Sequence, residues 1–400
     1  MVPRTARAAT SSSATFPPSA LATIAISMDA AAPCAAPPAT KGWFNAMVVR
    51  KVATAARERV TREYITGTMR KALLALLVPG LVHTVLAGSP AGPLAHTFSI
   101  VARDAATGEM GVAVQSHWFA VGSMVTWAEA GVGAIATQSF IDPGYGPRAL
   151  GLMRGAVSAP DALKQLVAAD AQRDGRQVAM VDAAGRVSAF TGKSAIAAAG
   201  HHIGPGFSAQ ANMMANAKVW PAMAAAFERT QGDLADRMLA ALDAGQAAGG
   251  DIRGKQSAAL VVVKAKGTGR PWVGADRTFD LRVDDNPNPI GELRRLVRLQ
   301  RAYAHANRGD ELMTEKKVDE ALREYAAASK VAPDILELPF WHAVTLASIG
   351  REAEAAPIFK AVFAKEPIWA DLLARLPAAG LFPNDRALLE RVQRLRPRRP

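Results

Sequence analysis

The chain is almost free of cysteine. Its 400 residues include one cysteine, Cys34, which lies in the N-terminal segment. The part that we expect to fold therefore has no disulfide, no thiolate nucleophile and no cysteine-ligated zinc or cluster. A chain without these groups suits an oxidising compartment as well as a reducing one.

A concentrated basic stripe is also lacking. The formal net charge is +12, but residues 1–87 hold ten Lys/Arg and three Asp/Glu. The rest of the chain carries 37 basic and 32 acidic residues, a net charge of +5, with the two signs interspersed. Proteins that bind nucleic acid gather their basic residues on one face. We therefore expect no nucleic-acid partner.

The apolar run near the N-terminus is too short for a stable membrane span. Ala72–Leu86 is interrupted by Pro79 and His83, and a spanning helix needs about 20 apolar residues. Two basic residues follow Met69 directly, and small or medium residues end the run, which is typical of a signal peptide. We predict a periplasmic or secreted protein, with an uncleaved membrane anchor as the alternative.

The segment before this run has a biased composition. Residues 1–68 are rich in Ala, Ser, Thr and Pro, and such a stretch cannot bury enough apolar surface to offset its ordering entropy. We interpret it as an over-extended gene start that is not translated, with a disordered leader as the alternative. Residues 69–95 are then a signal peptide and a short linker.

Residues 96–285 show strands and helices in alternation. The order is sheet, two helices, sheet, two helices, sheet, and short turns join neighbouring strands. This order predicts an α+β fold in which helices cover both sides of stacked antiparallel sheets. The predicted strands include TFSIVARD (97–104), MGVAVQS (110–116), MVTWAEA (124–130), VGAIATQS (132–139) and QSAALVVVKA (256–265), with a hairpin in QVAMVDAAGRVSAFTG (177–192) and strand and loop in HHIGPGFSAQANMM (201–214). The predicted helices are RALGLMRGA (148–156), PDALKQLVAADA (160–171), KVWPAMAAAFERT (218–230) and DLADRMLAALDAGQAAG (233–249).

Beyond the segment NPNP (286–289), residues 290–400 are nearly all helical in pattern. A small, an aromatic and a proline position recur in that order with a period of 34 residues, which is typical of tetratricopeptide repeats. Two repeats are too few to stand alone, so we expect them to dock on the helix 290–307 or on the first domain. The recurring pairs are Ala321 and Ala355, Tyr325 and Phe359, and Pro333 and Pro367. We expect both aromatic residues to be core residues.

Seven blocks of the first domain carry a family resemblance. They are TFSIVARD (97–104), GVAVQSHWFAVG (111–122), WAEAGVGAIATQS (127–139), GPRAL (146–150), VDAAGRV (181–187), AFTG (189–192) and AGQAAGGDIRGKQSAAL (244–260). Together they resemble domain-of-unknown-function family 1028, which is assigned to the N-terminal-nucleophile (Ntn) hydrolase superfamily. The resemblance covers roughly residues 97–283. It implies a four-layer αββα sandwich and a Thr, Ser or Cys at the mature N-terminus.

In such a hydrolase the terminal side chain attacks an amide carbonyl and the α-amine is the general base, because its pKa near 8 leaves part of it unprotonated at pH 7. Thr97 is the candidate nucleophile. His96 stands before it, so signal cleavage after Ala87 or after Ala95 leaves Thr97 internal. A free amine then requires attack by the Thr97 hydroxyl on the His96 carbonyl, or trimming by another peptidase. Otherwise Thr97 is a β-branched residue in a strand.

Other candidates follow the strand ends. Ser116 and His117 are catalytic candidates, although neighbours on a strand point to opposite faces and do not form a dyad by spacing alone. The substrate-binding candidates are Gln138, Ser139, Tyr145, Gln210, Asn212, Asp251, Arg253 and Ser257. Within this set, Gln210 or Asn212 suits an oxyanion-hole donor, and Asp251 and Arg253 either hold a substrate or pair with each other to order a loop.

We expect no metal and no cofactor. His201 and His202 diverge on a strand and have no carboxylate at metal-ligand spacing. The segment GPG (204–206) lacks the third glycine of a dinucleotide loop, and the chain has neither a phosphate loop nor a G-x-S-x-G elbow.

The sequence thus favours an exported Ntn-type amidohydrolase that acts on a small amide or peptide. The first alternative is a non-catalytic module on the same fold that holds a peptide or cell-wall fragment. In both cases the helical tail recruits a protein partner. A further alternative makes the tail the working part and the sandwich its scaffold, and a homo-oligomer is left open.

Overall fold

The computed structural model describes residues 94–270 and 274–397. The predicted leader (1–68) and nearly all of the predicted signal peptide and linker (69–95) lie outside the described residues. Within the described ranges, no helix has both the length and the hydropathy that crossing a bilayer requires.

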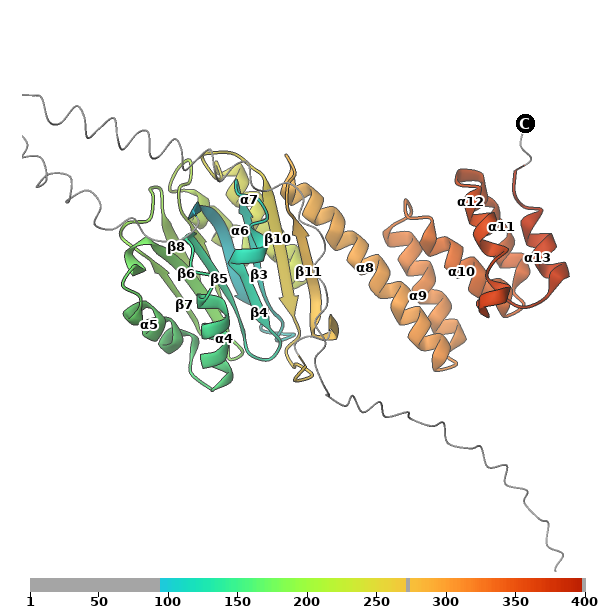
Figure 1. Ribbon diagram of the computed structural model, residues 1–400, viewed down its shortest axis with the longest axis horizontal. Coiled ribbons are helices and arrows are strands. Elements are labelled where there is room, and N and C mark those ends of the chain that lie inside the picture. The colour runs from blue at the N-terminus through green and yellow to red at the C-terminus, as the bar shows by residue number, and fades with distance from the viewer. Residues whose placement is uncertain (1–93, 271–273, 398–400) are drawn as a thin grey trace, which may run out of the picture. The chain divides into compact units, whose positions relative to one another are not determined.

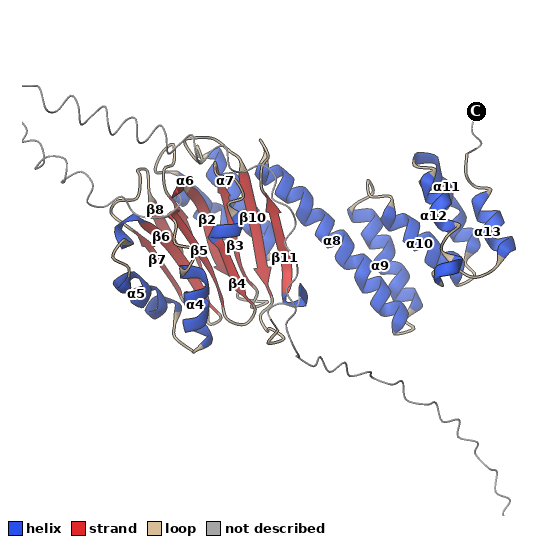
Figure 2. Ribbon diagram, in the orientation of Figure 1, coloured by secondary structure: helices blue, strands red, loops and turns tan. Residues whose placement is uncertain are grey.

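Two antiparallel sheets form the first part of the described chain (Figures 1 and 2). In the first sheet the order is β1-β5-β6-β7, and β4 also pairs with β5. In the second the order is β11-β10-β3-β2-β9-β8. The first sheet consists of β1 (Leu94–Ala95), β4 (Thr126–Glu129), β5 (Gly133–Phe140), β6 (Arg176–Asp182) and β7 (Val187–Thr191). The second consists of β2 (Thr97–Arg103), β3 (Met110–Ser116), β8 (Gly200–Gly204), β9 (Phe207–Ala211), β10 (Ser257–Val263) and β11 (Arg277–Val283).

Helices cover the outer face of each sheet. Packed on the first sheet are α4 (Tyr145–Arg154) and α5 (Ala159–Ala169), and on the second α6 (Val219–Arg229) and α7 (Leu234–Ala247). A third apolar layer, which includes Val112, Ala134 and Val261, joins the two sheets. The predicted arrangement of antiparallel sheets with helices on both sides is therefore confirmed.

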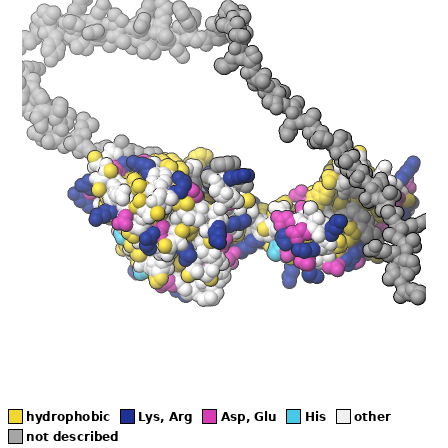
Figure 3. Space-filling view, turned by 90° about the horizontal axis from the view of Figure 1, so that it is seen from below, with side chains coloured by type: hydrophobic (Ala, Val, Ile, Leu, Met, Phe, Trp, Pro, Cys, Tyr) yellow, Lys and Arg dark blue, Asp and Glu magenta, His cyan; other side chains and the backbone are white. Residues whose placement is uncertain are grey.

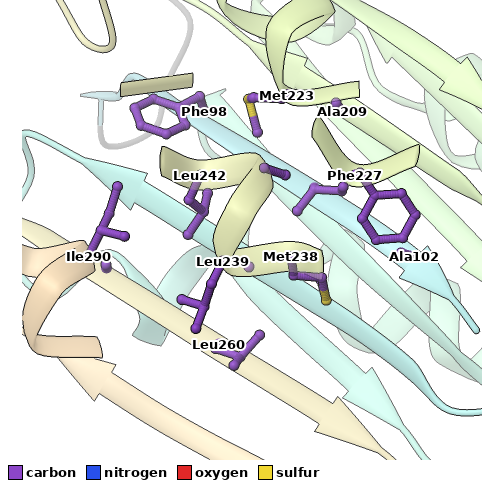
Figure 4. Packing of buried hydrophobic residues seen from close by; sticks show 14 of the residues in the cluster. Phe98, Ala102, Ala209, Met223, Phe227, Met238, Leu239, Leu242, Leu260 and Ile290 are labelled. Carbon is purple, nitrogen blue, oxygen red and sulfur yellow. The ribbon is translucent and has the colours of Figure 1, made fainter. Parts of the chain in front are cut away.

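The layer between α7 and the second sheet shows how the sequence produces this packing. Apolar residues recur on one face of α7, as in Met238, Leu239 and Leu242. Figure 4 shows these side chains pointing onto the strands, where they meet Phe98 of β2 and Leu260 of β10. All five side chains are fully buried, and each contributes about 1.5–3 kcal/mol of burial.

Three elements differ from the sequence predictions. The start of MVTWAEA (124–130) is not strand but the end of a short helix, α3 (Gly122–Val125), whose last turn is closed by a hydrogen bond from Thr126 Oγ1 to the Gly122 carbonyl. The strands β1 and β11 were not predicted. β1 has two residues and so no periodicity, whereas β11 alternates Phe279, Leu281 and Val283, which pack in the core, with more exposed residues, a strand pattern that was not used.

The C-terminal region is helical, as predicted. It runs through α8 (Pro289–Thr314), α9 (Val318–Val331), α10 (Glu337–Ser348), α11 (Glu352–Lys365), α12 (Ile368–Leu373) and α13 (Arg386–Gln393). The first turns of α8 pack on the second sheet through Ile290 and Leu293, and its later part packs on α9. The recurring aromatics Tyr325 and Phe359 are both buried in one core.

On the face shown in Figure 3, basic and acidic side chains are interspersed.

Candidate active site

The space between the sheets changes character along the strands. Along most of the strands the side chains that face the space between the sheets are apolar, as in Val101, Val112 and Ala134. They alternate along each strand with side chains that face outward. Toward the N-terminal end of β2 the inward-facing positions become polar on six strands. These polar residues are Thr97, Ser99, Ser116, Gln138, Gln177, Ser208, Gln210 and Ser257, with Asn212 just after β9, and every one is fully buried.

Hydrogen bonds connect this polar layer across the two sheets. The Gln177 Oε1 atom accepts from Gln138 Nε2 at 2.6 Å and from Asn212 Nδ2 at 2.8 Å. Ser99 Oγ donates to Gln138 Oε1 at 2.6 Å and accepts from Gln210 Nε2 at 2.7 Å. A buried polar network is stable only when its members are satisfied, so these side chains hold one another in fixed orientations.

Thr97 lies at the centre of the layer as the first residue of β2. Its carbonyl oxygen accepts from Gln138 Nε2 at 3.1 Å and from the Asn212 backbone N–H at 3.1 Å. Its hydroxyl donates to the Ala95 carbonyl at 2.9 Å. The position of Thr97 is thus fixed by both sheets, and its nitrogen is in the peptide bond that follows His96.

The carbonyl before that peptide bond receives two side-chain donors. Ser116 Oγ donates to the His96 oxygen at 2.6 Å, and Arg253 Nη2 donates to it at 2.8 Å. Two donors that converge on one carbonyl oxygen form the arrangement of an oxyanion hole, which stabilises negative charge developing on that oxygen. The His96–Thr97 peptide bond would have to break to free the Thr97 amine, and it is the carbonyl oxygen of this bond that receives the two donors.

Arg253 is held in place by Asp251. The Asp251 carboxylate is fully buried and accepts from Arg253 Nε at 3.0 Å and Nη2 at 2.7 Å, as well as from the His117 backbone N–H at 3.2 Å. The preceding Gly249 and Gly250 have φ of 126° and 60°, which side chains rarely adopt. Asp251 and Arg253 therefore pair with each other, as one of the two predicted roles has it, and the guanidinium also reaches the His96 carbonyl, while the substrate-holding role stays a prediction.

The His96 ring fills a buried space beside the same bond. Its Nδ1 lies 2.7 Å from Asn212 Oδ1, and its edge faces Phe140 with ring centroids 5.8 Å apart. Burial lowers the pKa of His96 below its ordinary value of 6.5, and this effect is larger than the opposing effect of the hydrogen bond that the ring donates to Asn212 Oδ1. The ring is therefore neutral at pH 7, and its buried Nε2 has no hydrogen-bond partner.

The segment before Thr97 crosses from one sheet to the other. β1 pairs with β5, so Leu94 lies opposite Phe140 and Ala95 opposite Ser139, and after His96 the chain enters β2 of the second sheet. Ser139 has φ of 73° and a buried Oγ without a hydrogen-bond partner. Backbone strain of this kind in a non-glycine residue concentrates at functional sites.

The structure brings most of the predicted site residues together but excludes Tyr145. Its hydroxyl donates to Asp170 Oδ2 at 3.1 Å, and its ring packs between α4, α5 and the outer face of the first sheet. Burial and then Asp170 raise the pKa of Tyr145, so the ring is a neutral core residue. The predicted loop role was wrong because YGPRAL begins α4 and turns this side chain away from the inter-sheet layer.

Other predicted residues lie at the edge of the layer. His117 is half-buried and contributes its backbone N–H to Asp251. Ser257 donates to the Trp118 carbonyl and accepts from the Val121 N–H, so it fixes the loop after β3. Gln210 reaches Thr97 only through Ser99 and Gln138.

Sequence reasoning missed Ser99, Gln177 and the His96 ring as site residues. A usable signal exists for the first two. Each lies on the same face of its strand as apolar residues two positions away, as Gln177 does with Ala179 and Val181, and a polar residue on an otherwise apolar face is informative.

In the ranges that the structure describes, no group of three or more His, Cys, Asp or Glu is arranged to hold a metal ion.

Comparison with known proteins places the chain in a family. Residues 97–293 match the model described as "Family of unknown function (DUF1028)". The chain is 32% identical to the solved protein SPO2555 from Silicibacter pomeroyi, also of DUF1028, over 50% of this chain and 84% of that one, with a TM-score of 0.46. No curated protein matches. On the family model and this identity, the chain belongs to the family of unknown function DUF1028.

Proposed function

We propose that this protein is an Ntn-type amidohydrolase with Thr97 as nucleophile and general base. The observation that carries the proposal is the pair of donors, Ser116 and Arg253, on the carbonyl before Thr97. A peptide bond in a strand needs no charged side chain on its carbonyl for folding alone. The buried polar layer around Thr97 adds support, because it holds the residue rigidly with backbone and amide donors.

Exposure of the Thr97 amine is the first step of the proposed mechanism. The Thr97 hydroxyl oxygen attacks the His96 carbonyl carbon, and negative charge develops on the oxygen that Ser116 and Arg253 contact. The C–N bond breaks as the hydroxyl proton passes to the nitrogen, which leaves an ester on Thr97. Water hydrolyses this ester to the His96 carboxylate and the free Thr97 amine and hydroxyl.

Turnover repeats the same chemistry on an external amide. The free α-amine takes the hydroxyl proton while Oγ attacks the substrate carbonyl, and this proton then goes to the leaving amine. Water hydrolyses the acyl ester and restores Thr97. The sum is amide plus water to carboxylic acid plus amine. The donors on the former His96 carbonyl are then available for the substrate carbonyl.

A binding module on the same fold is the second candidate. One observation favours it: Thr97 is fully buried with its nitrogen in a peptide bond. A chain that keeps all the residues before Thr97, called the leader from here on, therefore has no general base. In that case the protein would hold a peptide or cell-wall fragment without cleaving it. The two candidates therefore differ on whether the leader leaves.

The remaining parts fit a protein that works outside the cytoplasm with a partner. Under this proposal the segment from Met69 directs export, and the helices α9 to α12 form a tetratricopeptide-like pair. Support comes from the spacing of α9 and α11, which begin at Val318 and Glu352, 34 residues apart. Their shared core would keep the helices of the tail folded. The tail would then hold a protein partner or protein substrate near the site.

The test is hydrolysis of a panel of peptides and simple amides by purified protein. We expect the Thr97→Ser variant to retain activity, because serine keeps the hydroxyl and the amine, and Thr97→Ala to lose it. Ser116→Ala should lower kcat by about 10²-fold, as loss of one oxyanion donor does. Equal activity of Thr97→Ala and wild type, or no hydrolysis by a chain that begins at Thr97, would contradict the proposal.

A further inference from the structure

The residues before Thr97 occupy a complete set of binding contacts. Their backbone extends the first sheet through Ser139 and Phe140 of β5, their last carbonyl receives Ser116 and Arg253, and the His96 ring is buried against Asn212. Removal of the leader leaves these groups in place, because they belong to strands and a loop that are fixed elsewhere. Asp251 holds Arg253, and Gln177 holds Asn212.

We propose that this space is the acyl-side binding site of the mature protein, and that it takes an extended peptide whose last acyl residue carries a planar, hydrogen-bonding ring such as imidazole. The inference rests on the proposed function in so far as the leader must leave. The peptide would add to the edge of β5 as an antiparallel strand, a common mode of peptide recognition in which main-chain bonds give affinity and a side-chain pocket gives selectivity.

The ring pocket has a defined chemistry. Asn212 Oδ1 accepts one N–H, Phe140 supplies an apolar wall, and the surroundings favour a neutral ring because burial lowers the His96 pKa. A lysine or arginine side chain would bring an unpaired charge into this space, which is costly. An aliphatic side chain would leave Asn212 Oδ1 without its donor.

The carbonyl contacts favour the same occupant before and after cleavage. Arg253 and Ser116 donate to a neutral acyl carbonyl, and the guanidinium also suits the carboxylate that hydrolysis produces. The buried His96 Nε2 and Ser139 Oγ have no partner. A segment with only a structural role is expected to satisfy its buried polar atoms. In a binding site, an unpartnered atom such as Ser139 Oγ is available to hydrogen-bond a different ligand.

The first test uses the full chain with His96→Gly, which empties the ring pocket, in a Thr97→Ala background that keeps the residues before Thr97 attached. The probe is 4-methylimidazole, the side chain of histidine. We expect it to raise the melting temperature of this variant saturably and to leave the Thr97→Ala chain with its own His96 unchanged. Adding Asn212→Leu should weaken the apparent affinity about tenfold, the worth of one buried neutral hydrogen bond. No saturable rise in His96→Gly, or the same affinity with Asn212→Leu, would overturn the inference.

The second test measures peptide binding by calorimetry to chain that has released its leader. We expect the tetrapeptide Pro-Leu-Ala-His to bind about tenfold more tightly than Pro-Leu-Ala-Leu. Tight binding without hydrolysis of the matching amide contradicts the hydrolase and keeps the site. Hydrolysis without preference for the histidine peptide overturns the site and keeps the hydrolase. A leader that is never released would overturn the inference, because His96 would then fill the site permanently.

Discussion

Replacement of Gln177 by leucine tests whether the polar layer is a connected network. Gln177 is fully buried, and its Oε1 accepts from Gln138 and Asn212 while its Nε2 lies 2.9 Å from the Ala211 carbonyl. Leucine has a similar volume but leaves these groups without that partner. Gln138 keeps a second acceptor in the Thr97 carbonyl, whereas Asn212 Nδ2 keeps only a contact of 3.4 Å to it.

An unsatisfied buried polar group costs about 1–3 kcal/mol. With Asn212 Nδ2 left only its 3.4 Å contact, the Ala211 carbonyl losing a side-chain donor and Gln138 keeping a second acceptor, we expect Gln177→Leu to lower the free energy of unfolding by about 3–5 kcal/mol, a large share of the 5–15 kcal/mol of a typical domain. Urea titration followed by circular dichroism measures this change. Gln165→Leu, the same replacement at an exposed position of α5, should stay within about 0.5 kcal/mol. A loss below about 1 kcal/mol for Gln177→Leu would refute the network.

Two further predictions concern pH and packing. Because the folded-state pKa of His96 lies below its ordinary value of 6.5, the unfolded chain binds more protons as pH falls below 6.5, and the stability of the Thr97→Ala chain, which keeps His96, should fall as pH drops below this value. Stability measured over this range should depend less on pH in His96→Gln, and an unchanged pH dependence would contradict the assignment. Gly192→Ala should destabilise by about 2–3 kcal/mol, because its Cβ would lie 2.3 Å from the Asp174 carbonyl oxygen. Gly151→Ala, with no atom within 4 Å on an exposed part of α4, should stabilise by about 0.5–1 kcal/mol; equal melting temperatures for these two variants would contradict the packing argument.

The sequence predicted the elements with strong periodicity and failed at the others. MGVAVQS forms β3 with the predicted bounds, and the hairpin of β6 and β7 turns at Gly185 with φ of 80°. β10 is buried along its whole length, as its apolar run indicated. β1 was not predicted because it has only two residues, and its partner strand β5 lies 38 or more positions further along the chain. Such a long-range pairing leaves no local pattern in the sequence.

For the site, the sequence identified residues but not their connections. Thr97, Ser116, Gln138, Asn212 and Arg253 were all candidates, and the structure places them around one peptide bond. What could not be read from the sequence is that Arg253, far along the chain, reaches the His96 carbonyl. This depends on the pairing of β3 with β10 and on two left-handed glycines.

His96 shows the same limit most clearly. In the sequence it is an obstacle between the leader and the proposed nucleophile. In the structure its carbonyl is contacted by Ser116 and Arg253, and its ring by Asn212. Spacing in the sequence could not predict this, since all three partners come from other strands or loops.

The measurement that tests the account most directly is the intact mass and N-terminal sequence of the purified full chain, followed over time in the absence of other peptidases. The account predicts a chain that begins at Thr97, formed by wild type and by Thr97→Ser and absent from Thr97→Ala. A wild-type chain that keeps His96 attached to Thr97 indefinitely would contradict it, because the proposed general base would then never be free.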